Sequence, residues 1–350
     1  MFYLKYRPKK ISELDNSQIK EKIGKILDSK NIPHALLFIG PKGMGKTSTA
    51  RIFAKSVNCL DNKLSGKGDS FEPCGKCVNC RGIETGGSPD VVEQDAASNR
   101  GIDEIRKLIR ESAFSPMTGK YRIYIIDEAH MITNDAFNAL LKTLEEPPKS
   151  VIFILATTNE EKLPDTIISR CVRIAFGTAK KSDIKNMLSR IAKSEKLKIP
   201  DATMDLISKY SENSFRDAAK LLEELVTNDK LDFENAQTYL GIRSKGALLD
   251  IMQKGTLEQA MAWVTEFEES GGNVKRTIED SLAVLRDNLI SKSTKKPSDL
   301  DLDFTLREIS TLIGLFHEAY KNIRLSPIPS LPLELVIVEF YNGRKLIDNS

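Results

Sequence analysis

The feature that most constrains this sequence is the run Gly40-Pro41-Lys42-Gly43-Met44-Gly45-Lys46-Thr47, a full match to G-x-x-x-x-G-K-[ST]. An apolar run at 35–39 precedes it and is short enough for a buried strand, and residues 47–55 can form a helix. A glycine turn between a strand and a helix directs backbone N–H groups at one anion. Four fixed positions match by chance in about 1 of 100 chains of this length. The run therefore predicts a nucleoside triphosphate site.

Two side chains of this loop have expected roles. Lys46 would reach the β- and γ-phosphates, and the hydroxyl of Thr47 would ligate Mg²⁺. The other residues of the segment that we expect to bind the nucleotide are Gly40, Pro41, Lys42, Gly43, Met44, Gly45 and Ser48.

A second apolar strand, expected at 121–126, ends in Asp127-Glu128-Ala129-His130. A strand that ends in two carboxylates is the expected partner of such a loop, with Asp127 in the Mg²⁺ shell and Glu128 polarising the attacking water. The alternative is an acidic pair that caps the following helix. His130 is interpreted as a structural histidine rather than a base. After the strand at 151–155, Thr158 or Asn159 would touch the γ-phosphate or the water.

Four of the five cysteines belong to an insertion at 59–80 that we expect to be irregular. Cys59 is followed by a C-x-x-C-x-x-C run of Cys74, Cys77 and Cys80, a ligand set typical of tetrahedral, structural Zn²⁺. An iron–sulfur cluster is the competing metal site, although the run does not continue with x₃-C-P. Four reduced surface thiols are the remaining alternative.

Alternation of strands and helices predicts an α/β fold with a parallel, doubly wound sheet, preceded by a basic, extended N-terminus. Further strands are expected at 91–93 and 172–176. After Gly177 the apolar spacing is helical throughout, and Trp263 is expected in a core. We predict three domains, at 1–177, 178–242 and 243–350.

Composition sets only broad limits. The chain has 350 residues, and its net charge of +3 does not by itself indicate a nucleic-acid binder. No apolar run approaches the roughly 20 residues that cross a bilayer, and residues 1–10 lack the apolar stretch of a signal peptide. We therefore expect a cytoplasmic protein without a membrane partner.

Together these motifs resemble the bacterial DNA polymerase III gamma/tau subunits, the AAA+ ATPases of replicative clamp loaders. The likeness covers the whole chain and is strongest from Tyr6 to Arg216. It depends on the glycine loop, the four cysteines and the segments 6–8, 95–98, 127–130, 138–148, 156–158 and 169–171. The string Leu-Leu-Lys-Thr-Leu-Glu-Glu-Pro-Pro and the triplet Ser-Arg-Cys are close to diagnostic of clamp loaders.

The resemblance implies roles that the residues alone do not assign. Arg170 would be an arginine finger that acts in trans at a neighbouring subunit's ATP site. Thr158 and Arg216 would be the first and second sensors, and Tyr6 and Arg7 would line the adenine side. The three domains would be an AAA+ P-loop ATPase domain, a helical lid domain and a helical collar domain for oligomerisation.

The resemblance also implies an ATP-dependent motor that loads a sliding clamp onto primed DNA. Its partners would be the clamp, the delta and delta-prime subunits, further copies of itself and primer–template DNA. DNA would be held through its phosphates, independently of sequence, with Asn99, Arg100 and Lys142 facing the duplex. A solvated helix face explains three nearby basic residues equally well: Arg106, Lys107 and Arg110.

Two departures from the family pattern qualify this reading. The usual Val-Gly-Gln is replaced by Asn16-Ser17-Gln18, which bears on the adenine contacts, and the sequence stops after the collar-like helices. A delta-prime-like scaffold that does not hydrolyse ATP is the non-enzymatic alternative, and the intact Lys46, Thr47, Asp127 and Glu128 argue against it. An AAA+ DNA-junction motor is the enzymatic alternative.

Overall fold

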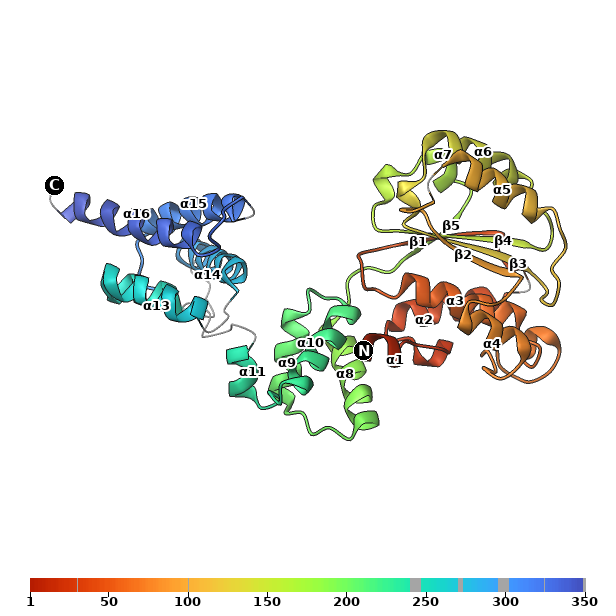
Figure 1. Cartoon of the computed structure of the whole chain (residues 1–350), viewed down its shortest axis with the longest axis horizontal. Helices are drawn as coiled ribbons and strands as arrows, with labels where there is room; N and C mark the ends of the chain where they lie inside the picture. The colour runs from red at the N-terminus through yellow and green to blue at the C-terminus, as the bar shows by residue number, and fades with distance from the viewer. Residues whose placement is uncertain are drawn as a thin grey trace. The chain divides into compact units, whose positions relative to one another are not determined.

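The computed structural model describes residues 1–29, 31–99, 101–239, 247–269, 273–294, 302–323 and 325–348 (Figure 1). The chain forms two compact units, 1–228 and 229–350. The expected boundary at 242/243 lies outside the described residues, so the three-domain division stays a prediction. Within the described ranges, no helix combines the length and the apolarity that a membrane span requires.

A five-stranded sheet forms the centre of the first unit, in the order β2-β3-β4-β1-β5 with all neighbouring pairs parallel. The strands are β1 (Ala35–Ile39), β2 (Val91–Asp95), β3 (Arg122–Asp127), β4 (Val151–Thr157) and β5 (Val172–Ala175). Every residue of β4 is buried, because a central parallel strand is covered on both faces. The parallel α/β sheet predicted from the sequence is confirmed.

Helices cover both faces of this sheet, with α5, α6 and α7 on one side and α2, α3 and α4 on the other (Figure 1). They are α2 (Ser17–Asp28), α3 (Lys46–Asn58), α4 (Val78–Thr85), α5 (Ile102–Ser112), α6 (Asn134–Glu145) and α7 (Asp165–Ile168). Leu37, Tyr124 and Phe153 belong to the same buried cluster as Leu108 of α5 and Phe137 of α6. This packing fixes the sheet against its helices.

Three more helices complete the first unit: α8 (Lys181–Glu195), α9 (Asp201–Tyr210) and α10 (Phe215–Thr227). We call them the helical group. Their buried residues recur at helical spacing, as in Ile184, Leu188 and Ile191 of α8. Ser214 caps α10, since its hydroxyl accepts a hydrogen bond from the N–H of Asp217 at 3.3 Å.

One local expectation was wrong, and another holds for only part of its range. The N-terminus is not extended, because Phe2–Lys5 form the short helix α1, and the N–H of Phe2 donates to Glu223 Oε2 of α10 at 3.0 Å. A helix of one turn is unstable alone, so distant contacts such as this one and the ion pair between Lys5 and Glu195 stabilise it. The insertion at 59–80 is less irregular than expected, because Cys77 caps α4 and Cys80 lies in the first turn of that helix.

The second unit is helical: α11 (Phe233–Tyr239), α12 (Ala247–Lys254), α13 (Leu257–Glu269), α14 (Val274–Thr294), α15 (Leu306–Asn322) and α16 (Leu331–Asp348). A single apolar cluster joins α12 to α16, and Trp263 packs against it in a stack with Phe267 at 4.9 Å between ring centroids. The core position expected for Trp263 is confirmed.

Candidate nucleotide site and cysteine cluster

The register of the sheet gathers the carboxyl ends of its strands at one edge. Ile39 of β1 lies beside Thr157 of β4, and Asp95 of β2 lies beside Asp127 of β3. The loop Gly40–Thr47, called the P-loop below, begins at this edge directly after β1. Ligands of open parallel α/β sheets bind at the carboxyl ends of the strands, so this edge is where the predicted site belongs.

Two glycines of the P-loop are required by its backbone. Gly43 and Gly45 have φ angles of 81° and 86°, in the left-handed region that side chains disfavour. A Cβ on Gly43 would also lie 2.0 Å from Ser214 Oγ and 3.3 Å from Arg216 Cβ. The P-loop therefore touches the first turn of α10 at Gly43, and the contact is too close for any other residue.

The side chains of Lys46 and Thr47 lie at the start of α3 and point to different partners. Thr47 Oγ1 donates to Asp127 Oδ2 at 2.6 Å, which places the two predicted Mg²⁺ ligands in contact. Lys46 Nζ donates to the carbonyl oxygens of Gly40 and Pro41 at 2.6 and 3.0 Å. Burial lowers the pKa of Lys46, against the nearby Glu128 and Asp127 carboxylates, which raise it. An anionic phosphate would compete with the two carbonyls for this ammonium group.

Glu128 is held by two neighbours at the end of β3. Thr158 Oγ1 donates to Glu128 Oε2 at 3.1 Å, so the predicted sensor contacts the predicted catalytic carboxylate. His130 Nδ1 lies 3.5 Å from the same oxygen and 3.1 Å from Thr157 Oγ1. From the sequence, His130 was interpreted as a structural histidine, and its contact with Glu128 was not predicted. The signal for that contact was the Asp-Glu-Ala-His run, in which the two residues are only two positions apart.

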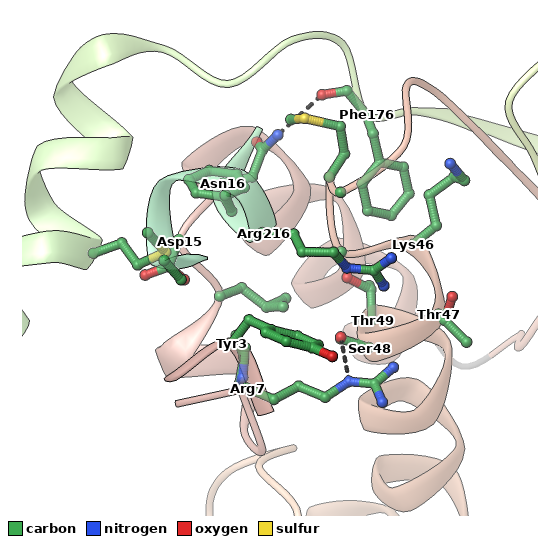
Figure 2. Close-up of a pocket in the computed structure, with 18 of the residues that line it drawn as sticks. Tyr3, Arg7, Asp15, Asn16, Lys46, Thr47, Ser48, Thr49, Phe176 and Arg216 are labelled. Atoms are coloured by element: carbon green, nitrogen blue, oxygen red, sulfur yellow. Dashed lines mark hydrogen bonds between the residues drawn. The ribbon is translucent and has the colours of Figure 1, made fainter. Parts of the chain in front are cut away.

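A pocket adjoins the P-loop, and three parts of the first unit line it (Figure 2). These are the P-loop with the first turn of α3, the N-terminal segment from Phe2 to Ile19, and α8 and α10 of the helical group; Phe176 adds one further contact. Asp127 and Glu128 also line the pocket, and the Arg216 side chain projects from α10 beside it (Figure 2). The structure therefore brings together residues from the beginning, middle and end of the first unit's sequence.

The N-terminal wall holds the residues assigned to the adenine side. Tyr6 and Arg7 both line the pocket, and Arg7 Nε donates to Ser48 Oγ at 2.6 Å. Asn16, from the segment that departs from the family pattern, also lines it and donates from Nδ2 to the carbonyl of Phe176 at 3.0 Å. Sequence reasoning missed Tyr3, which lines the same wall three residues before Tyr6.

Arg170 lies outside the pocket of its own chain. It follows α7, and its Nη1 donates to the carbonyl of Thr166 at 2.7 Å while Nη2 pairs with Glu145 at the end of α6. Arg170 is not among the residues that line the pocket next to the P-loop. Action on a neighbouring subunit stays a prediction.

The residues expected to face DNA are less informative. Asn99 donates from Nδ2 to the carbonyl of Asp95 at 3.1 Å, and Lys142 is exposed on α6. Arg100 lies outside the described residues. Arg106 forms an ion pair with Asp103 on α5 at 3.8 Å, in keeping with a solvated helix face. The DNA contacts stay predictions.

The four clustered cysteines converge at the end of α3 and the start of α4. Their sulfur atoms all lie within 4.8 Å of one another, and Cys74 Sγ is 4.0 Å from Cys80 Sγ. A tetrahedral ion with metal–sulfur bonds of about 2.3 Å separates its sulfurs by about 3.8 Å. The spacing fits one such ion, whereas a multi-iron cluster would hold its cysteines farther apart.

Backbone amides support ionised sulfurs in this cluster. Cys59 Sγ accepts from the N–H of Cys74 at 3.3 Å, and Cys74 Sγ accepts from the N–H of Cys77 at 3.3 Å. Burial raises the pKa of Cys59 and of Cys80, whereas at Cys77 amide hydrogen bonds, including one from Cys80, outweigh burial and bring the pKa to about 7. The fifth cysteine, Cys171, is apart from the cluster, and burial raises its pKa to about 11. The donor set is chemically suited to Zn²⁺.

Comparison with known proteins places these sites in context. A family model described as "DNA polymerase III, delta subunit" matches residues 15–180. The chain is 35% identical over 356 residues to DNA polymerase III subunit tau of Bacillus subtilis, covering 96% of this chain and 62% of that protein. It is 38% identical over 258 residues to DNA polymerase III subunit gamma of Buchnera aphidicola subsp. Schizaphis graminum, covering 73% of this chain and 69% of that protein.

A third relative, DNA polymerase III subunit gamma/tau of Mycoplasma genitalium, is 31% identical over the whole chain, which spans 61% of its length. The chain thus spans about three fifths of the length of the tau-type relatives. Among solved structures, a variant of Thermotoga maritima RuvB has a TM-score of 0.50 at 17% identity, covering 74% of this chain and 85% of that one. At this identity the likeness concerns the fold alone.

Proposed function

The chain belongs to the DNA polymerase III gamma/tau subunit family, and on that premise we propose that it is an ATP-hydrolysing motor subunit of the clamp loader. The observation that carries the proposal is that Lys46, Thr47, Asp127 and Glu128 meet at one edge of the sheet, in a pocket that Arg216 also lines. ATP bound there would link the sheet to the helical group. Its hydrolysis would then change how the two are held together.

The chemistry follows from the placement of each side chain. Thr47 and Asp127 would hold Mg²⁺, which when bound offsets the negative charge of the phosphates. Glu128 orients the water that attacks the γ-phosphate and takes up its proton, and Thr158 fixes the Glu128 carboxylate through the hydrogen bond at 3.1 Å. Lys46 exchanges its loop carbonyls for phosphate oxygens.

A complete site would need a second subunit. Arg170 does not line its own pocket; by exchanging Thr166 and Glu145 for a phosphate oxygen, its guanidinium would stabilise charge on a phosphoryl group in a neighbouring copy. The loader would then assemble from copies of this chain with delta and delta-prime subunits. It would act on the sliding clamp and, through phosphates, on primer–template DNA in the cytoplasm.

The cysteine cluster would hold one structural Zn²⁺ through Cys59, Cys74, Cys77 and Cys80. Four protein ligands leave no open position for chemistry, so the ion would stabilise the junction of α3 and α4. Asn79, next to Cys80, donates to the carbonyl of Asn58 at the end of α3 at 2.9 Å. The metal site would in this way brace the helix that begins at the P-loop.

A delta-prime-like scaffold is the second candidate, because the matching family model is described as a delta subunit. A scaffold would neither bind ATP tightly nor hydrolyse it. The contact between Thr47 and Asp127 favours a working site, since both side chains are present and paired. An AAA+ DNA-junction motor would instead displace strands or migrate branches without a clamp.

The test mixes two inactive variants of the full chain, Lys46→Ala and Arg170→Ala, in the presence of the partner subunits. At equal mixing, about one interface in four would combine an intact P-loop with an intact arginine from its neighbour. We expect partial recovery of ATP hydrolysis in the mixture and none in either variant alone. Continued inactivity of the mixture would contradict action of Arg170 across subunits.

A further inference from the structure

Helix α1 connects the helical group to the P-loop helix. The N–H of Phe2 donates to Glu223 of α10 at 3.0 Å, and Lys5 Nζ pairs with Glu195 at the end of α8 at 2.7 Å. Directly after α1, Arg7 bonds the hydroxyl of Ser48 in the first turn of α3. A few residues at the start of the chain therefore span from the helical group to the nucleotide loop.

Tyr3 lies at the middle of this connection, with its ring against two cations of α10. The Arg216 guanidinium carbon lies 6.0 Å from the ring centroid, and Lys220 Nζ, one turn along the helix, lies 5.9 Å from it. Figure 2 shows the Tyr3 ring below the Arg216 guanidinium at the pocket wall. The negative face of an aromatic ring attracts cations at this separation.

Arg216 has little else to hold it in place. Among the residues that the structure describes, its guanidinium has no hydrogen-bond or ion-pair partner, and the side chain is exposed. Its Cβ is close to the P-loop at Gly43, and its charge is near enough to Lys46 to help lower the pKa of that group. Left free, a long cationic side chain would turn away from the positive loop and sample many rotamers.

We propose that Tyr3 is a positioning residue for Arg216, holding the guanidinium on the pocket side of α10 against repulsion from Lys46. Through Tyr3, helix α1 thereby helps Arg216 of the helical group to contact the γ-phosphate. The inference rests on the proposed function, since it takes Arg216 to contact that phosphate. The competing role for Tyr3 is a stacking surface for the base, which ATP and ADP share.

The experiment measures the Kd values of ATP and ADP, with Mg²⁺, for the full chain carrying any tag at its C-terminus. Tyr3→Leu keeps an apolar side chain but removes the ring face, and Tyr3→Phe keeps the ring face as the matched control. We expect Tyr3→Leu to weaken ATP by about two- to fivefold, the value of an exposed cation–π contact, and to leave ADP nearly unchanged. Tyr3→Phe should retain the preference for ATP.

The same measurements in an Arg216→Ala background complete the test. There Tyr3→Leu should have no further effect on the ratio of ADP to ATP affinities. Equal weakening of ATP and ADP by Tyr3→Leu, or an undiminished effect without Arg216, would overturn the inference. If Arg216→Ala leaves the ratio of ADP to ATP affinities unchanged, Arg216 does not contact the γ-phosphate, and both its proposed role and the inference fail. If Arg216→Ala changes the ratio but Tyr3→Leu does not, the proposed function stands and the inference fails.

Discussion

The contact between Gly43 and Ser214 makes a sharp prediction for Gly43→Ala. The φ angle of 81° strains any side chain, at a cost of about 1–2 kcal/mol. The new Cβ would also lie 2.0 Å from Ser214 Oγ, so the Ser214 hydroxyl must rotate away and give up its cap on α10. Loss of such a cap costs about 1 kcal/mol. The substitution should therefore destabilise the first unit by about 2–3 kcal/mol.

Gly45 provides the matched control for this prediction. Its φ angle is 86°, yet a Cβ added there meets no atom within 4 Å. Gly45→Ala should therefore cost only the strain, about 1–2 kcal/mol. In a Ser214→Ala background the clash with the hydroxyl is gone and no hydroxyl cap is left to lose, so Gly43→Ala should cost about 1 kcal/mol less there than in the unmodified chain. The approaches of 3.2 Å to the Cβ of residue 214 and 3.3 Å to that of Arg216 remain, so the cost should stay above that of Gly45→Ala.

Urea unfolding followed by far-ultraviolet circular dichroism measures these free energies. Trp263 is the only tryptophan and lies in the second unit, so its fluorescence transition should stay constant in all variants. Equal destabilisation by Gly43→Ala with and without the Ser214→Ala substitution would refute the reasoning, because the P-loop would then not touch α10. A shift of the Trp263 transition would show that the variants act on the whole chain.

Three further predictions concern other parts of the first unit. Burial acts to raise the pKa of Asp90, but hydrogen bonds from the amides of residues 117–119 outweigh it and hold the pKa low. The stability that the ionised carboxylate gives the first unit is therefore present above about pH 4 and is lost as the pH falls further. Asp90→Asn should cost about 2–3 kcal/mol at pH 7 and remove this acid sensitivity, as measured by urea unfolding at pH 7 and pH 3. Thr158→Val should slow single-turnover hydrolysis about five- to tenfold with little change in ATP affinity, because Glu128 loses its hydrogen bond at 3.1 Å, and a parallel loss of affinity would contradict that role. The purified chain should contain about one zinc per molecule by atomic emission; Cys80→Ser should lower both the metal content and the melting temperature, and an unchanged melting temperature would argue against a structural ion.

The sheet and the P-loop could be predicted from sequence because their signals are local. Residues 35–39 and 151–155 are short apolar runs typical of strands covered on both faces, and the P-loop spacing is fixed by the turn itself. Asp127 could be predicted from an equally local signal, because it is the acidic residue at which an apolar strand ends. In each case the neighbours along the chain carry the information.

The features that were missed depend on residues far apart along the chain. Helix α1 is stabilised by Glu223, more than 200 positions away, and no local pattern marks that contact. The ring of Tyr3 faces Arg216 for the same reason. Likewise Glu145, recognised only as part of a family string, is the partner of Arg170 within the chain. Such pairs follow from the tertiary packing and not from spacing.

The central claim is that the pocket between the P-loop and the helical group binds ATP with Mg²⁺. Isothermal titration of the full chain tests it most directly, with Lys46→Ala as the comparison. We expect one ATP per chain, with binding at least about tenfold weaker in the variant, since a charged phosphate contact is lost. Absence of binding by the unmodified chain, or equal binding by both proteins, would contradict the claim.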